Sequence, residues 1–240
     1  MQNTKKISNN FASGKQLAVL IDPDKCSSEQ IVKVVRESVK ANVDYLFVGG
    51  SLLYNSLDEC INLIKAECDI PVILFPGNAM QISNNADAIL FISLISGRNP
   101  EYLIGHHVIA APFLKNSGLE ILPTAYILIE NGKRTSVEYM SNTNPIPADK
   151  PEIVVATAMA GEMLGLKFIY LEAGSGGTNP VGQHIISEVS RNTNIPVIVG
   201  GGIKTPEDAS SVYKSGAGLI VVGNAIEMDY SVIQAISETR

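Results

Sequence analysis

The sequence predicts an α/β fold in which eight parallel strands, each followed by a helical segment, close into a barrel. The first observation is length, because 240 residues suit one barrel of ~250 residues. The second is the recurrence of short runs rich in Val, Ile and Leu, each followed by a turn and an amphipathic stretch. The third is their spacing, which averages about 29 residues, the size of a strand–helix–strand repeat.

The expected strands follow from these apolar runs. In chain order they are Leu17–Ile21, Asp44–Val48, Pro71–Phe75, Asp87–Ile92, Ile121–Ile129, Lys167–Glu172, Ile195–Val199 and Gly218–Val222. No Gly/Ser-rich linker or charged run divides the chain, so we expect one TIM-type (β/α)8 domain over residues 1–240. A doubly wound open sheet shows the same alternation, but the first turn, Asp22-Pro23-Asp24, lacks the G-x-G-x-x-G fingerprint of that fold.

Helix starts are marked by capping residues and by prolines that suit a first helical turn. These signals occur at Ser27/Ser28, Asn99-Pro100, Lys150-Pro151, Asn179-Pro180 and Thr205-Pro206.

Two units depart from the regular repeat. Only about 16 residues separate Pro71 from Asp87, so the third helix is expected to be short or irregular. After the fifth strand, Asn131-Gly132 stands between alternating residues, which predicts a hairpin there.

Composition excludes several classes of protein. Charged residues make up 18%, the net charge is −6, and no basic run is longer than Lys5-Lys6, so a nucleic-acid partner is not expected. The polar first ten residues provide neither a signal-peptide apolar region nor a spanning helix. Cys26, Cys60 and Cys68 form no C-x-x-C pair, which favours reduced thiols and a cytoplasmic location.

Glycine-led turns follow the last two expected strands, at Gly200–Gly202 and at Gly223-Asn224. Glycine lets backbone N–H groups approach an anion, and in this fold the carboxyl ends of the strands form the active site. These turns predict a phosphate cradle that needs no basic patch. The alternative is that the glycines only form tight turns. Whether Lys204 adds charge to the cradle stays open.

The sixth strand carries a candidate general base. Its two-residue alternation places Phe168, Tyr170 and Glu172 on one face, and the aliphatic residues between them belong under the outer helices. Glu172 is therefore expected to point inward at the barrel mouth, where it could remove a hydroxyl proton. The alternative is a structural ion pair. The turn at Gly174–Gly177 adds N–H donors and the Ser175 hydroxyl.

Hard oxygen ligands follow the first two strands. Asp22 and Asp24 flank Pro23, and Ser51 follows Gly49-Gly50, a set that suits Mg²⁺. Turn formation and helix capping would explain the two aspartates equally well. No histidine is assigned a role, because His106 and His107 are adjacent on a helix and His184 is isolated. The role of Arg98 stays open.

The combination of these segments resembles the geranylgeranylglyceryl phosphate synthase family, and in particular its larger subgroup. The matching segments are Leu20–Lys25, Val48–Ser51, Phe91–Leu103, Tyr170–Gly176, Gly200–Ile203 and Gly223-Asn224. The resemblance covers nearly the whole chain, and Y-L-E-A-G-S-G at 170–176 is its most specific part. It implies a modified TIM barrel that joins sn-glycerol 1-phosphate to a polyprenyl diphosphate with Mg²⁺ present, forming an ether bond and releasing diphosphate.

The resemblance also implies roles for individual residues. Asp22 and Ser51 correspond to the metal site, and Glu172 to the base, with Tyr170 as its catalytic neighbour. The residues implied to bind glycerol phosphate are Tyr170, Leu171, Glu172, Ala173, Gly174, Ser175, Gly176, Gly201, Gly202, Gly223 and Asn224. One departure is Leu20, where some members carry a lysine, and a phosphate contact from that position is not expected.

The sequence and the resemblance also predict partners of the chain. A homo-oligomer, either a dimer or a hexamer built from dimers, agrees with the family, and a substrate chain of ~20 carbons suggests transient contact with a membrane surface. Phe75–Gly77 and Tyr54 are the candidates for lining a prenyl channel, and the length of the prenyl chain stays open.

Two alternative functions also stay open. They are a phosphosugar isomerase or lyase on a similar barrel, and a barrel that binds a phosphometabolite without catalysis.

Overall fold

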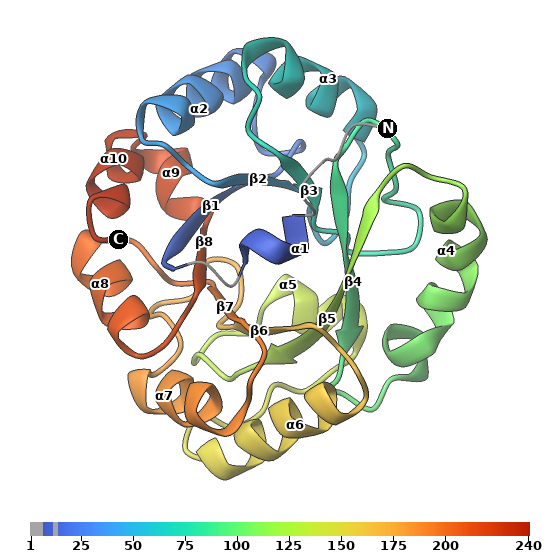
Figure 1. Ribbon diagram of the computed structural model, residues 1–240, viewed down its shortest axis with the longest axis vertical. Helices are drawn as coiled ribbons and strands as arrows, with labels where there is room; N and C mark the ends of the chain where they lie inside the picture. The colour runs from blue at the N-terminus through green and yellow to red at the C-terminus, as the bar shows by residue number, and fades with distance from the viewer. Residues whose placement is uncertain (1–6, 12–13) are drawn as a thin grey trace.

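The eight strands pair in chain order, all in parallel, into a closed barrel, as the computed structural model of the chain shows (Figure 1). The structure describes residues 7–11 and 14–240. The strands are β1 (Gln16–Ile21), β2 (Tyr45–Val48), β3 (Val72–Leu74), β4 (Ala88–Leu94), β5 (Glu120–Leu128), β6 (Phe168–Glu172), β7 (Val197–Gly200) and β8 (Leu219–Val222). The predicted barrel is confirmed, and each strand end lies within two residues of its predicted position.

Most of the helices surround the barrel, but the short first helix lies over its middle (Figure 1). They are α1 (Ile7–Asn10), α2 (Ser28–Lys40), α3 (Leu57–Glu67), the π-helical turn η1 (Glu101–Gly105), α4 (His106–Lys115), α5 (Ser136–Ser141), α6 (Pro151–Met163), α7 (Gln183–Asn192), α8 (Pro206–Lys214), α9 (Asn224–Met228) and α10 (Ser231–Ser237). Ser27 and Thr205 each form a capping box, and Pro151 opens α6, as predicted.

Two helix starts differ from the prediction. After Asn99-Pro100 the chain first makes the π-helical turn η1 and only then continues as α4. The start predicted at Asn179-Pro180 is wrong, because α7 begins at Gln183. The carbonyl of Asn179 accepts a hydrogen bond from the side chain of Asn131 at 2.7 Å, so this segment belongs to a loop tied to the β5 end of the barrel.

The third unit is irregular, as predicted. The segment between β3 and β4 lies within the described part of the chain and contains no helix. Its turns are held by side chains instead, since the Gln81 side chain accepts from the N–H of Gly77 and donates to the carbonyl of Gly50, both at 2.9 Å.

The hairpin predicted after the fifth strand is wrong. Ile129 instead forms a parallel bridge with Ile146, and α5 lies between them. In a closed barrel β5 already has a neighbour on each side, so no free edge remains for a returning strand. Thr135 caps α5 by accepting a hydrogen bond from the N–H of Glu138. The turn at Asn131-Gly132 is therefore followed by a helix and not by a returning strand.

Strand alternation divides the core in two. Inward-facing residues such as Phe47, Leu90 and Tyr170 fill the barrel, and outward-facing ones such as Ile169 and Leu171 pack under the helices. The predicted inward face of the sixth strand is therefore confirmed.

The amino end of the barrel is closed by α1 and Phe11. The ring of Phe11 stacks on Tyr45 at 4.9 Å and packs against Phe168 at 4.8 Å. The first turn of α1 is held in place because the N–H groups of Ile7 and Ser8 donate to the carboxylate of Glu120, at 2.7 and 3.1 Å.

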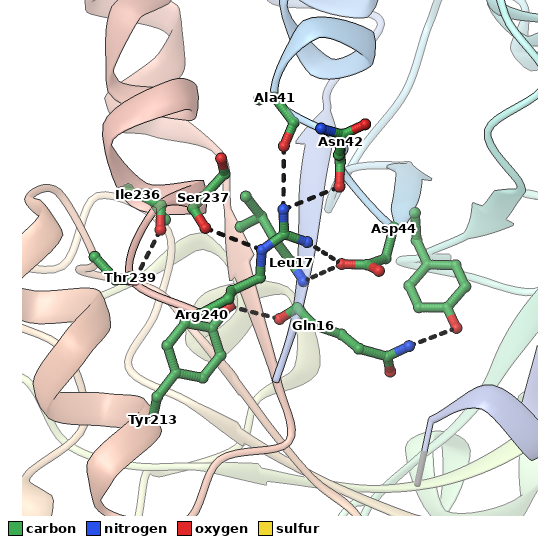
Figure 2. A network of polar contacts seen from close by, with 11 residues as sticks. Gln16, Leu17, Ala41, Asn42, Asp44, Tyr213, Ile236, Ser237, Thr239 and Arg240 are labelled. Carbon is green, nitrogen blue, oxygen red and sulfur yellow. Dashed lines mark hydrogen bonds and ion pairs between the residues drawn. The ribbon is translucent and has the colours of Figure 1, made fainter. Parts of the chain in front are cut away.

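Arg240 ties the segment after α10 to the amino ends of β1 and β2 (Figure 2). Its guanidinium donates to Asp44 at 2.6 Å and to the carbonyls of Ala41, Asn42 and Ser237 at 3.0–3.1 Å. Asp44 also accepts from the N–H of Leu17 at 2.8 Å. The floor of the barrel is therefore fixed on the side opposite the strand ends where the site lies.

We expect Arg240→Ala to lower the free energy of unfolding by about 2 kcal/mol, because several charge-assisted hydrogen bonds are lost at a partly buried position. Urea unfolding measures this effect. Arg191→Ala is the matched control, since Arg191 is exposed and pairs with Glu188 on its own helix, and its expected loss is below about 0.5 kcal/mol. Equal losses in the two variants would contradict a structural role for the Arg240 contacts.

Candidate active site

A cavity of about 770 Å³ opens at the carboxyl ends of the strands, a volume within the usual range for small-molecule sites. One half is polar and lies among the loops after β1, β2, β6, β7 and β8. The other half is apolar and lies between β3, β4 and α4. Its apolar lining includes Ala79, Ile82, Ile89, Phe91, Ala110 and Leu114.

Glu172 lies at the end of β6 and is only 5% exposed. Its Oε1 accepts a hydrogen bond from the N–H of Gly174 at 2.6 Å, and the hydroxyls of Tyr126 and Tyr170 also hydrogen-bond to the carboxylate. Burial raises the pKa of Glu172 to about 7, and the three hydrogen bonds oppose that rise by stabilising the charged form. A carboxylate with a pKa near neutrality is suited to accept and release protons.

The two tyrosines reach Glu172 because of strand register. Tyr126 on β5 is paired with Tyr170 on β6, and both point into the barrel. Their rings stack at 5.1 Å, and the ring of Phe75 completes a cluster of three, 5.2 Å from Tyr170 and 6.1 Å from Tyr126. Gly200 leaves room for the Tyr170 hydroxyl, which lies 2.1 Å from where a Cβ at position 200 would be. Sequence analysis missed Tyr126, although the two-residue alternation of the fifth strand could have placed it inward.

The glycine turns border the buried carboxylate. Gly201 has a φ of +80°, and a Cβ there would lie 2.5 Å from Oε1 of Glu172. Gly202 has a φ of +73°, and a Cβ there would lie 2.1 Å from the carbonyl oxygen of Asn179. Both positions therefore require glycine. The Ser175 hydroxyl donates to the Asn224 side chain at 3.0 Å, which joins the β6 loop to the start of α9.

Asp22 and Ser51 both line the polar half of the cavity. Oδ1 of Asp22 accepts from the N–H of Asp24 at 3.1 Å, and Oδ2 lies 3.6 Å from Nζ of Lys25. Within residues 7–11 and 14–240, His, Cys, Asp and Glu side chains form no group of three or more that could hold a metal ion. One carboxylate and a hydroxyl at the mouth of the cavity fit Mg²⁺, which usually takes its other ligands from water and substrate phosphates.

The structure separates the remaining candidates. Most of the predicted set lines the cavity, namely Tyr170, Glu172, Ser175, Gly176, Gly201, Gly202, Gly223 and Asn224, whereas Gly174 does not. Leu171 and Ala173 do not, because their side chains pack in the outer core. Gly174 contributes through its N–H to Glu172. Phe75–Gly77 line the cavity, whereas Tyr54 is 86% exposed and lies outside it.

Three residues whose roles were open also have defined contacts. Asp24 accepts from the N–H groups of Tyr54 and Asn55, both at 2.8 Å, so it holds the loop after β2. Arg98 donates to the carbonyl of Gly97 at 2.7 Å and lies outside the cavity lining. Lys204 lines the cavity, with Nζ 3.2 Å from the carbonyl of Thr178.

His106 and His107 both border the cavity, contrary to the argument that adjacent residues cannot face one site. They lie where η1 passes into α4, and this junction forms part of the wall of the apolar half. The ring of His106 packs edge-on against Tyr102 at 4.8 Å, and that of His107 against Phe91 at 4.4 Å. Burial lowers the pKa of His107, which favours a neutral ring in this wall.

Glycine-bearing loops after β6, β7 and β8, which border one cavity at the carboxyl end of the barrel, define a class, the (β/α)8 barrels that bind phosphate esters. Within that class, the chain belongs to the PcrB family, whose sequence model matches residues 11–240. This confirms the family resemblance predicted from the sequence motifs. Within the described residues, no helix is both long enough and apolar enough to cross a membrane.

Relatives named geranylgeranylglyceryl phosphate synthase align with almost the whole chain. One from Chitinophaga pinensis is 52% identical and covers 97% of this chain and 95% of its own. One from Spirosoma linguale is 49% identical and covers 93% and 90%. The crystal structure of (S)-3-O-geranylgeranylglyceryl phosphate synthase from Thermoplasma acidophilum, in complex with its substrate sn-glycerol-1-phosphate, superposes with a TM-score of 0.90 at 36% identity, covering 96% of this chain and 95% of that one.

The shifted pKa of Glu172 makes stability depend on pH. Between about 4.5 and 7 the folded protein retains a proton that the unfolded chain releases, so this group lowers stability as pH rises through that window. Glu172→Gln removes the effect. We expect the stability of this variant relative to the native protein to increase by on the order of 3 kcal/mol between pH 4 and pH 8.

Urea unfolding at the two pH values measures the difference. The exposed Glu130→Gln is the control for the substitution itself. A relative stability of Glu172→Gln that is the same at both pH values would contradict a raised pKa in the folded protein.

Proposed function

We propose that the chain is a prenyltransferase that joins sn-glycerol 1-phosphate to geranylgeranyl diphosphate, or to a similar polyprenyl diphosphate, forming an ether bond and releasing diphosphate. The observation that carries this proposal is that one cavity combines a buried carboxylate, glycine turns beside it and an apolar half. The names of the relatives and the substrate bound in the Thermoplasma acidophilum structure support it.

The glycine turns would hold the phosphate of glycerol phosphate. Gly201, Gly202 and Gly176 bring backbone to the cavity without side chains, so N–H groups can approach the phosphate oxygens. These dipoles are fixed by the barrel, which allows an acidic protein to bind an anion locally. Because Gly201 adjoins Glu172, a phosphate held there would bring the glycerol hydroxyls towards the carboxylate.

Glu172 would act as the general base. It takes the proton from the free primary hydroxyl of glycerol phosphate as that oxygen forms a bond to C1 of the prenyl group. The bond between C1 and the diphosphate oxygen breaks, and its electron pair leaves with the diphosphate. The proton stays on Glu172 until solvent removes it. Tyr170 would hold the carboxylate in place through its hydroxyl.

The apolar half would hold the prenyl chain. Its walls come from β4, from η1 and α4, and from the helix-free segment after β3. Hydrocarbon side chains such as Ile89, Phe91 and Leu114 match the chain and exclude water from the reacting allylic carbon. A phosphosugar isomerase or lyase, or a barrel that only binds a phosphometabolite, would have no use for this half.

The chain is also proposed to form homo-oligomers. The outer face of η1 and α4 exposes Ile104, Val108, Ile109 and Phe113, an apolar face of the kind that interfaces cover. A monomer mass by light scattering at micromolar concentration would contradict this proposal.

Transient contact with a membrane surface is the second proposed interaction, and it rests on the low solubility of the prenyl substrate. Co-sedimentation with lipid vesicles tests it.

The assay that tests the function offers purified protein glycerol 1-phosphate with several polyprenyl diphosphates and Mg²⁺. We expect an ether-linked prenylglyceryl phosphate, detected by mass, whose chain length identifies the preferred donor. Glu172→Gln should lower kcat by about 10²–10⁴-fold, the usual contribution of a general base, while glycerol phosphate still binds. Binding without any product from the native protein would favour the non-catalytic alternative, and an isomerised or cleaved phosphosugar would favour the other.

Asp22 and Ser51 are the residues proposed to hold Mg²⁺, whose charge, when it is bound, would offset that of the departing diphosphate. We expect chelation to abolish ether formation and added Mg²⁺ to restore it. Asp22→Asn should raise the Mg²⁺ concentration for half-maximal activity by about tenfold or more, because the only carboxylate of the proposed site is lost. Asp149→Asn, at an exposed position, is the matched control. Full activity of the native protein in chelator would remove the metal from the proposal.

A further inference from the structure

We propose that Tyr126 is a positioning residue that works with Tyr170 to hold the carboxylate of Glu172 in the orientation that accepts the substrate proton. The inference rests on the proposed function, because it assigns a part in that reaction. It concerns a residue from β5, outside the motif at 170–176 that pointed to the base.

Burial, strand register and ring stacking place the side chain of Tyr126 beside that of Tyr170. Tyr126 is 6% exposed, and its register partner on β6 is Tyr170. The two rings are 5.1 Å apart with an interplanar angle of 24°, and Phe75 lies 5.2 Å from Tyr170 at 25°. Stacking on this scale restricts both phenol rings. The hydroxyls of Tyr126 and Tyr170 both reach Glu172.

The carboxylate needs these donors because it is buried. Its described partners are the N–H of Gly174 and the two phenol hydroxyls, which are uncharged. A buried carboxylate that loses one of three donors becomes harder to ionise and freer to rotate. Charged side chains do line the same cavity on the loops after β1, β5 and β7, namely Asp22, Asp24, Lys25, Arg134 and Lys204. The shifted pKa of Glu172 is nevertheless accounted for by burial and by these three hydrogen bonds.

The two tyrosines hold the carboxylate from different strands. Tyr170 is two residues from Glu172 on the same strand, so it would move with the carboxylate if β6 shifted. Tyr126 belongs to β5 and fixes the carboxylate relative to a second strand. Removing its hydroxyl should therefore affect proton transfer more than binding of glycerol phosphate, whose proposed cradle lies on the loops after β6, β7 and β8.

The test uses Tyr126→Phe, which keeps the stacked ring and removes only the hydroxyl. Tyr45→Phe is the matched control, because Tyr45 is another buried tyrosine of the barrel interior whose hydroxyl bonds to Gln16, at the closed end. In Tyr126→Phe we expect the acid limb of the pH profile of kcat to move to higher pH. One lost hydrogen bond to a charged group corresponds to a decrease in kcat of about tenfold at pH 6.

The pH dependence separates a positioning role from a packing role. If Tyr126 stabilises the ionised base, activity relative to the native protein recovers at pH 9, and KM for glycerol phosphate stays within about twofold. Tyr45→Phe should leave the acid limb unchanged. An acid limb of Tyr126→Phe that coincides with that of the native protein would overturn the proposal.

A measurement without turnover keeps this inference distinct from the proposed function. Carbon-13 NMR of protein with labelled glutamate follows the Glu172 carboxyl, whose resonance is assigned by its absence in Glu172→Gln. The titration midpoint should be higher in Tyr126→Phe than in the native protein. If the native protein makes no ether product, the proposed reaction fails while this titration still tests the contact. An unchanged midpoint would overturn the role of Tyr126.

Discussion

The site depends on one constraint, which is that a carboxylate is buried at the mouth of the barrel and that, among the residues that the structure describes, uncharged groups are its hydrogen-bond partners. Burial disfavours the charged form of Glu172, and a backbone N–H and two phenols partly offset that cost. A full ion pair would have stabilised the charged form further and lowered the basicity of the group. Uncharged donors leave the pKa of Glu172 near neutral pH, where a general base is effective. The stacked rings of Tyr126 and Tyr170 hold the two phenol donors, and Gly200 leaves room for one of them.

The barrel meets this constraint because its strands cannot slide independently. Each strand is paired on both sides, so the register that places Tyr126 beside Tyr170 is fixed around the whole ring. The closed end is fixed by Phe11 and by the contacts of Arg240. The open end carries the departures from the regular repeat, because the segment after β3 forms no helix and α4 borders the apolar lining of the cavity. A polar half and an apolar half therefore share one scaffold.

The elements that could be predicted from sequence were those governed by local periodicity. The inward direction of Glu172 followed from the alternation of β6, and the glycine turns followed from composition at the strand ends. Leu171 and Ala173 were included in the predicted site because the whole segment 170–176 matches the family. The same alternation, however, turns their side chains outward. The hairpin at Asn131-Gly132 was wrong because the local turn signal carries no information on whether a neighbouring strand edge is free. Tyr126 and the two histidines were missed because their importance depends on which segments meet across the cavity.

Gly200 and Tyr170 illustrate a consequence for the evolution of the strand ends. The Tyr170 hydroxyl fills the volume that any side chain at position 200 would need, although the two residues lie on different strands. Position 200 cannot change alone: a larger residue there is compatible only with a shorter one at 170, which would in turn leave the base with one phenol fewer. Homologous chains that carry tyrosine at the position of Tyr170 should therefore keep glycine at the position of Gly200.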